Sequence, residues 1–153
     1  MTQKEFINHV LINEIGDVVD HHKWLSFILI CSGIEFLGGC IDKEVKKINT
    51  GGRSEKRFND AIEKLFPIKY HPFIKKPFNL YSELRCGMNH VSIPGMKLAL
   101  SETKSNHQNL SQWGDRIIIV AEDFYGDFKN ACNTVTLMIE NGQVIETFEI
   151  RVS

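Results

Sequence analysis

A mainly helical domain with a small β element near its C-terminus is the fold that this sequence predicts. Three observations favour it: apolar residues recur at helical spacing along most of the chain, two short strand-like runs follow residue 95, and turn signals separate these segments. The 153 residues are enough for one core, and 42% of them are apolar, which suits a folded protein. We therefore expect one domain over residues 1–153, a bundle of about five helices with a small β-hairpin or sheet.

The first part of the chain predicts three helices. Residues 3–19 carry apolar side chains at helical spacing, with Ile7 and Leu11 beside the main row: Phe6, Val10, Ile15 and Val18. Asp20 is expected to cap a second helix over residues 21–48, which is apolar on nearly all sides in its first half and should therefore lie at the centre of the bundle. Ser54 is expected to cap a third helix, which Pro67 ends.

A fourth helix is predicted after an irregular connection. Residues 68–77 hold two prolines, a histidine and aromatic side chains, which favours an ordered, irregular connection. Residues 78–90 then carry an apolar row typical of a helix: Leu80, Leu84 and Met88.

The C-terminal part predicts strands and one long helix. Residues 96–101 and 116–122 have the composition of strands, and the polar stretch 102–115 between them indicates a long loop. Asp123 is expected to cap a fifth helix that ends at Asn141 and Gly142. The tail over residues 143–152 alternates in polarity, as a further strand or a frayed end would.

Charge is distributed unevenly along the chain. The net charge of −1 gives no global basic excess of the kind that advertises nucleic acid. Residues 51–90, however, carry eight Lys or Arg against four Asp or Glu. This basic middle section is either a strip that faces an anion or a set of solvated helix faces.

The cysteines and the most apolar segment bear on the cellular compartment. None of the four cysteines forms a C-x-x-C pair: Cys31, Cys40, Cys86 and Cys132. The N-terminus lacks the basic and apolar regions of a signal peptide, so we expect a cytoplasmic protein with reduced thiols. Residues 24–41 are strongly apolar, but Glu35 within them would be costly in lipid, so we expect a buried helix and no membrane contact.

Arg85 and His90, at the end of the fourth helix, are the candidate catalytic pair. Arg is a permanent cation suited to holding phosphate, and His exchanges protons near neutral pH. Together they suffice for metal-free RNA cleavage, in which His removes the 2′-hydroxyl proton or protonates the leaving 5′-oxygen and Arg stabilises the phosphorane. The structural alternative is a salt bridge for Arg85 and a helix-end position for His90 that the macrodipole favours.

The spacing of this pair sets a geometric condition. On an ideal helix, residues five apart are separated by about 140° around the axis. Arg85 shares a face with Tyr81 and Asn89, whereas His90 shares one with Cys86. Both can address one phosphate only if the helix frays, if Arg85 reaches round it, or if a second protomer completes the site.

The segment containing this pair resembles the HEPN superfamily, helical bundles whose functional members carry Arg, roughly four to six residues, and then His. The resemblance extends along most of the chain in short motifs similar in order to those of small bacterial proteins: Ile34–Gly38, Lys56–Phe58, Phe66–Tyr70, Leu80–His90 and Glu122–Tyr125. It implies a metal-independent endoribonuclease without a cofactor, which acts on RNA and forms a homodimer. An antitoxin-like protein is a further implied partner, since many members belong to toxin–antitoxin, CRISPR and phage-defence systems.

The resemblance also assigns residues. It places Arg85 and His90 in the site as catalytic groups, with Asn89 and Cys86 nearby as supporting residues. Members commonly have a polar residue, often Asn, directly after the Arg, where this sequence has Cys86. A non-catalytic module of the same fold, binding RNA, a nucleotide or a protein partner, is therefore the alternative function. An interaction protein in which both residues are structural is a third reading.

Other candidate residues have two interpretations each. Glu35, a carboxylate in an apolar helix, should be protonated or paired; it either orients Arg85 or His90 or forms an internal salt bridge. Cys86 and His90 lie four residues apart, but two ligands are too few for a closed metal site, so we expect no metal. Three aromatic residues interleaved with lysines either stack on bases or belong to the core: Tyr70, Phe73 and Tyr81.

Overall fold

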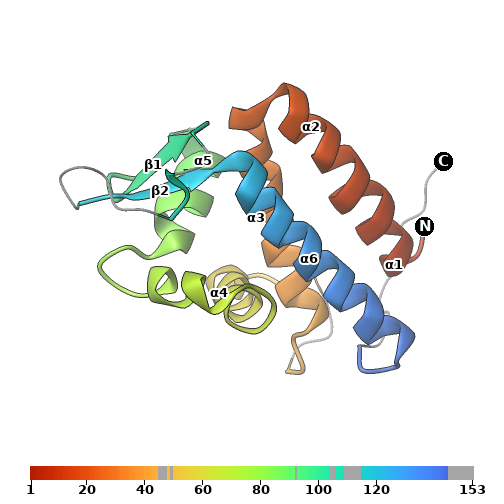
Figure 1. The fold of residues 1–153 in the computed structure, drawn as a ribbon. Helices are drawn as coiled ribbons and strands as arrows, with labels where there is room; N and C mark the ends of the chain where they lie inside the picture. The colour runs from red at the N-terminus through yellow and green to blue at the C-terminus, as the bar shows by residue number, and fades with distance from the viewer. Residues whose placement is uncertain (45–47, 49, 92, 104–105, 109–114, 145–153) are drawn as a thin grey trace.

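The computed structural model describes residues 1–44, 48, 50–91, 93–103, 106–108 and 115–144. The elements follow the chain as α1 (Gln3–Phe6), η1 (Ile7–Glu14), α2 (Ile15–His21), α3 (Lys23–Cys40), α4 (Ser54–Leu65), η2 (Ile68–Ile74), η3 (Tyr81–Cys86), α5 (Gly87–Val91), β1 (Leu98–Ser101), β2 (Ile117–Val120) and α6 (Ala121–Glu140). The η1 and η3 segments are π-helical, and η2 is a 3₁₀-helix. The predicted mainly helical fold with a small sheet is confirmed (Figure 1).

The N-terminal helix is continuous through α1, η1 and α2. Thr2 and Glu5 begin it with a capping box, in which each side chain accepts a hydrogen bond from the backbone N–H of the other. Its buried row shares Ile15 with the predicted row, and its other members are Ile7, Leu11 and Val19. The π-helical turns of η1 explain the difference, because their wider winding shifts which side chains share a face.

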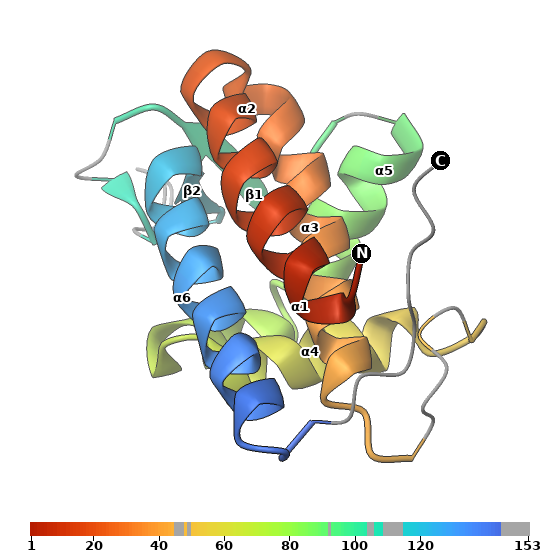
Figure 2. The same cartoon turned by 90° about the vertical axis from the view of Figure 1, so that its right-hand side faces the viewer.

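The α3 helix lies at the centre of the bundle, as predicted, with α1–α2, α6 and α4 packed around it (Figure 2). Two glycines permit these close approaches: a Cβ at Gly33 would overlap the ring of Phe128 on α6, and one at Gly38 would overlap the backbone carbonyl of Arg57 on α4. The predicted extension of this helix to residue 48 is wrong, since α3 ends at Cys40. Asp42 follows in a turn and binds Arg57, which ties the end of α3 to α4.

The predicted helix caps are partly wrong. His22, rather than Asp20, is the N-cap of α3; Arg53 precedes α4, so Ser54 is its first helical residue; and α6 begins at Ala121, two residues before Asp123. None of these three N-caps has a side-chain capping hydrogen bond. Tertiary contacts hold these ends instead, as in the ion pair of 2.5 Å between Lys23 and Glu122. The predicted ends at Pro67 and at Asn141–Gly142 are confirmed.

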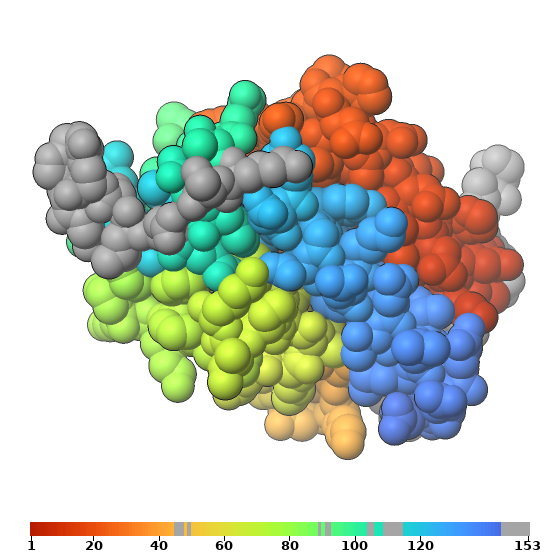
Figure 3. Space-filling view, in the orientation of Figure 1, coloured from red at the N-terminus to blue at the C-terminus, as the bar shows by residue number. Residues whose placement is uncertain are grey.

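The sheet consists of two parallel strands, so the hairpin form of the prediction is wrong. Leu98 pairs with Ile117 and Ser101 with Val120, and the connection between the strands must cross from one end of the pair to the other. The sheet lies at one end of the bundle, and β2 runs directly into α6 (Figure 1). In the space-filling view, α6 lies at the surface between the N-terminal helix and the chain around residues 66–78 (Figure 3). Beyond Val144, the predicted tail strand falls outside the described residues.

By length and composition, α3 is apolar enough to cross a membrane, with a mean hydropathy of 1.4 over 18 residues. Half of that window is buried inside the fold, as in the core helix of a folded domain. Core helices pass the same test, so this feature is weak evidence for a membrane span.

Candidate functional site

The helix formed by η3 and α5 carries the predicted catalytic residues. Leu80, Leu84 and Met88 lie four residues apart and are at most 2% exposed, so this row anchors the helix in the core. The π-helical turns end at Cys86, and Gly87–Val91 has α-helical geometry. The predicted fourth helix is thus present, and its apolar row is confirmed.

Arg85 is held between a carboxylate and an aromatic ring. Its Nε and Nη2 atoms lie 3.0 and 2.8 Å from the same oxygen, Oε2 of Glu35 on α3. Its guanidinium lies over the ring of Tyr81, 5.5 Å from the centroid, and that ring packs edge-on against Phe58. Glu35 therefore orients Arg85 through an ion pair within the chain. This contact agrees with both predictions for Glu35, the orienting role and the internal salt bridge.

The environment of Arg85 preserves its charge and leaves part of it accessible. Burial lowers the pKa of Arg85, but the charge and the hydrogen bond of Glu35 outweigh this and raise that pKa above its ordinary value. The side chain remains 20% exposed, and its Nη1 atom has no hydrogen-bond partner among the described residues. A partly exposed, oriented guanidinium with free donors can bind an anionic oxygen.

His90 lies apart from this group. His90 is exposed on α5, and among the described residues it forms no hydrogen bond or ion pair. Arg85 belongs to the π-helical turns of η3 and His90 to α5, so the separation of about 140° that an ideal α-helix gives to positions five apart does not apply to this pair. A single chain therefore unites Arg85, Glu35 and Tyr81, and it leaves His90 available on the surface.

The remaining supporting residues are placed only in part. Cys86 is half-buried next to Tyr81, and its charge and hydrogen bond contribute to the raised pKa of that phenol, of which burial is the largest cause. Asn89 lies within α5, but its side chain is outside the described set.

A tight turn packs against the helix between Arg85 and His90. The backbone carbonyl of Glu83 accepts a hydrogen bond from the N–H of Gly95 at 2.6 Å, and its carboxylate accepts one from the N–H of Lys97 at 2.9 Å. Gly87 makes room for this turn, because a Cβ there would lie 2.6 Å from the carbonyl oxygen of Ile93. Residues 93–97 are thus tied to the helix that carries His90.

The basic stretch is exposed, but its aromatic residues are mostly structural. Lys69, Lys75 and Lys76 are exposed. Tyr70 is completely buried, which is incompatible with the base-stacking interpretation for that residue. Phe73 packs edge-on against Phe78 at 6.0 Å. The lysines remain candidates for contact with phosphate.

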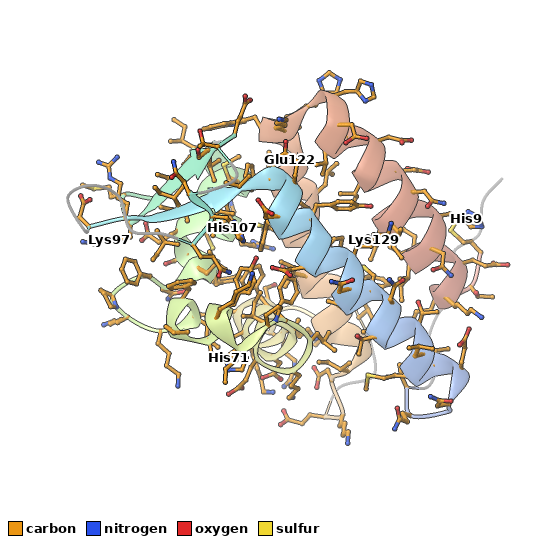
Figure 4. The ribbon with its side chains drawn as sticks, viewed as in Figure 1. His9, His71, Lys97, His107, Glu122 and Lys129 are labelled. Atoms are coloured by element: carbon orange, nitrogen blue, oxygen red, sulfur yellow. The ribbon has the colours of Figure 1, made fainter. Side chains whose placement is uncertain are left out.

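A polar network that no pattern in the sequence indicated joins η2, the turn over residues 106–108 and α6. The hydroxyl of Tyr70 donates to Asp127 at 2.8 Å and lies 2.9 Å from Nε2 of His107, which is placed where β2 meets α6 (Figure 4). Lys69 also binds Asp127, at 3.2 Å. These partners are 37 and 57 residues apart from Tyr70, so no short spacing in the sequence signals the network.

Elsewhere, a cavity of about 600 Å³ opens between the ends of α3, α4 and α6. Its lining includes Ile41, Leu65, Met138 and Val144, and neither Arg85 nor His90 contributes to it.

In the described part of the chain, no three His, Cys, Asp or Glu side chains are grouped as metal ligands would be. Compared with known proteins, the chain matches no family model, no curated protein and no solved structure.

Proposed function

We propose that this protein is a HEPN-like, metal-independent endoribonuclease that acts as a homodimer, with Arg85 and His90 as its catalytic residues. The observation that carries the proposal is the state of these two side chains. Arg85 is oriented by Glu35 and partly exposed, while His90 lies exposed and unpaired on the same helix in the described structure. One is a fixed cation and the other a free proton carrier.

The reaction that such a pair supports is transesterification of RNA. His90 removes the proton of a 2′-hydroxyl, whose oxygen then attacks the adjacent phosphorus. Arg85 stabilises the charge on the phosphorane through its uncommitted N–H donors. The bond from phosphorus to the 5′-oxygen breaks, the 5′-oxygen takes up a proton, and a 2′,3′-cyclic phosphate remains. A second group that donates this proton in the same step would speed the reaction, and His90 of the partner subunit is the group that a symmetric dimer would supply.

An uncovered face of α3 supports the dimer. Leu25 and Leu29 are 53% and 40% exposed, and Ser32, which is also exposed, continues the same face at helical spacing. Glu35, the partner of Arg85, lies beside this face. Two leucines exposed side by side on an otherwise buried helix are typical of a protein–protein contact, and pairing two copies through them would bring two sites close together.

The dimer has a direct test. Leu29→Asp should produce a monomer by size-exclusion chromatography with light scattering and should abolish cleavage. Leu137→Asp is the matched control, because Leu137 on α6 is exposed to a similar degree, 56%, outside that face. A wild-type protein that is monomeric at all concentrations would refute the composite site.

The catalytic proposal is tested with a labelled single-stranded RNA in the presence of EDTA. We expect cleavage that leaves cyclic-phosphate ends and that falls by at least about 100-fold in Arg85→Ala and His90→Ala. Arg116→Ala and His9→Ala are matched controls, because both residues are exposed, Arg116 directly before β2 and His9 on η1. Cleavage that persists in both site variants would contradict the assignment.

A non-catalytic RNA-binding module is the second candidate, and one observation favours it. The carboxylate of Glu35 neutralises much of the charge of Arg85, and Cys86 follows it in place of a polar residue. This function predicts RNA binding that weakens as salt is raised, with contributions from Lys75 and Lys76, and no turnover. If RNA does not bind at all, an antitoxin-like protein becomes the expected partner.

The four free cysteines suit the reducing cytoplasm that we propose for either function.

A further inference from the structure

The outer edge of β2 is closed by an imidazole in place of a strand. The N–H of Ile117 donates to Lys97 on the β1 side, and because backbone groups alternate along a strand, Ile118 and Val120 present theirs to the opposite edge. There the carbonyl of Ile118 accepts from the N–H of Gln108 at 2.7 Å, and the N–H of Val120 donates to Nδ1 of His107 at 3.1 Å. His107 thus takes the position of a backbone carbonyl in a neighbouring strand.

This geometry selects one protonation state of His107. Accepting from Val120 requires a lone pair on Nδ1, so the proton of the neutral ring lies on Nε2. From Nε2 it donates to the hydroxyl of Tyr70 at 2.9 Å, and that hydroxyl donates to Asp127 at 2.8 Å. The whole chain of donors is satisfied only by the neutral imidazole, because a protonated ring would direct an N–H at the N–H of Val120.

The charged groups around His107 come from two elements. On η2, Lys69 disfavours a second positive charge; on α6, the carboxylates of Asp123 and Asp127 favour it. Burial of the ring is the largest influence, and the balance places the pKa of His107 below its ordinary value of 6.5. The imidazole is therefore neutral at physiological pH, and it gains a proton only as the pH falls below its ordinary pKa.

We propose that His107 is a pH-sensitive switch for the outer edge of β2. In its neutral form it holds the turn over residues 106–108 against β2. On protonation it loses the acceptor for Val120, the turn separates from the strand, and the edge of β2 becomes open to solvent. This inference does not rest on the proposed function, because neither Arg85 nor His90 takes part in these hydrogen bonds.

The lowered pKa of His107 also sets the direction in which pH changes the stability of the fold. A histidine whose pKa is lower in the folded chain stabilises the fold fully at a pH above its unfolded value of 6.5. That contribution decreases as the pH falls through this value toward the folded pKa, since the unfolded chain then binds the proton more readily. Acidification, and not alkalinisation, should open the edge.

The first experiment reads the tautomer of wild-type His107 by two-dimensional ¹⁵N NMR of the ring nitrogens at about pH 7.5. We expect Nδ1 without a proton and Nε2 protonated. A ring protonated on Nδ1 at that pH would overturn the proposal. This measurement requires no substitution, so it holds even if a variant fails to fold.

The second experiment follows hydrogen exchange of the Val120 amide at about pH 7.5 and about pH 5.5, corrected for the intrinsic exchange rate. The protection factor should fall by about tenfold or more at the lower pH in the wild type. It should change little in His107→Asn, whose side-chain oxygen replaces Nδ1 as an acceptor that does not titrate. His9→Asn is the control, because His9 lies on the N-terminal helix, across the molecule from β2 (Figure 4). An equal fall in the wild type and in His107→Asn would refute the switch.

Discussion

Arg57 and Asp42 form an ion pair that is almost completely removed from solvent. Nε of Arg57 lies 3.0 Å from Oδ2 of Asp42, and the two side chains are 3% and 2% exposed. Arg53 reaches the same oxygen, also at 3.0 Å, from the residue that precedes α4. The pair therefore joins the end of α3 to two positions on the chain of α4.

Removing the acid of this pair should destabilise the protein strongly. Asp42→Ala leaves the guanidinium of Arg57 buried without its carboxylate, and we expect a loss of about 3–5 kcal/mol in the free energy of unfolding. Guanidinium chloride titration followed by circular dichroism measures it. Lys64→Ala is the control, because that lysine is 54% exposed and its contact with Asp60 is 3.5 Å long, so it should cost about 0.5 kcal/mol at most. A loss below about 1 kcal/mol for Asp42→Ala would contradict the structural role of the pair.

Thermal denaturation can separate a structural role from a chemical one at the candidate site. Arg85→Ala removes the partner of Glu35 and the cation over Tyr81, so we expect a loss of about 1–2 kcal/mol. His90→Ala removes an exposed side chain and should leave the melting temperature unchanged within error. A large drop for His90→Ala would mean that this histidine supports the fold, and it would weaken its assignment to catalysis.

Two glycines in helices should respond to alanine in opposite directions. At Gly87 the added Cβ would lie 2.6 Å from the carbonyl oxygen of Ile93, so Gly87→Ala should displace the turn and cost about 1–3 kcal/mol. At Gly126, within α6, nothing lies within 4 Å of the added Cβ, so Gly126→Ala should stabilise the protein by about 0.5–1 kcal/mol. Chemical denaturation measures the free energy of unfolding of both variants. Changes of the same sign would contradict the close packing of the turn against Gly87.

The hydroxyl of Tyr70 should contribute to stability through its two partners. Tyr70→Phe keeps the buried ring but leaves Nε2 of His107 without an acceptor, and we expect a loss of about 1–3 kcal/mol. His107→Leu disrupts the same network, so the double variant should lose less stability than the sum of the two single variants. Strict additivity in a double-mutant cycle would show that these residues act independently.

Local patterns in the sequence were sufficient for the helical class. Leu80, Leu84 and Met88 predicted the helix that carries Arg85, and the apolar residues of α3 predicted a helix at the centre of the bundle. Pro67 and Gly142 marked helix ends correctly, because their backbone preferences act within a few residues. These features depend on spacing and on local conformation, both of which are written along the chain.

Contacts between distant residues decided the rest. The pairing of Glu35 with Arg85 joins positions 50 apart, and the network of His107, Tyr70 and Asp127 joins three separate elements. The parallel arrangement of β1 and β2, and the end of α3 at Cys40 before the Asp42–Arg57 pair, likewise depend on what packs alongside. Hydrogen bonds and ion pairs form between groups that folding brings together, so their partners cannot be derived from periodicity. The sequence by itself therefore determined which segments are helical and which residue types are available for chemistry, and the tertiary structure decided which of those side chains are paired, buried or left exposed.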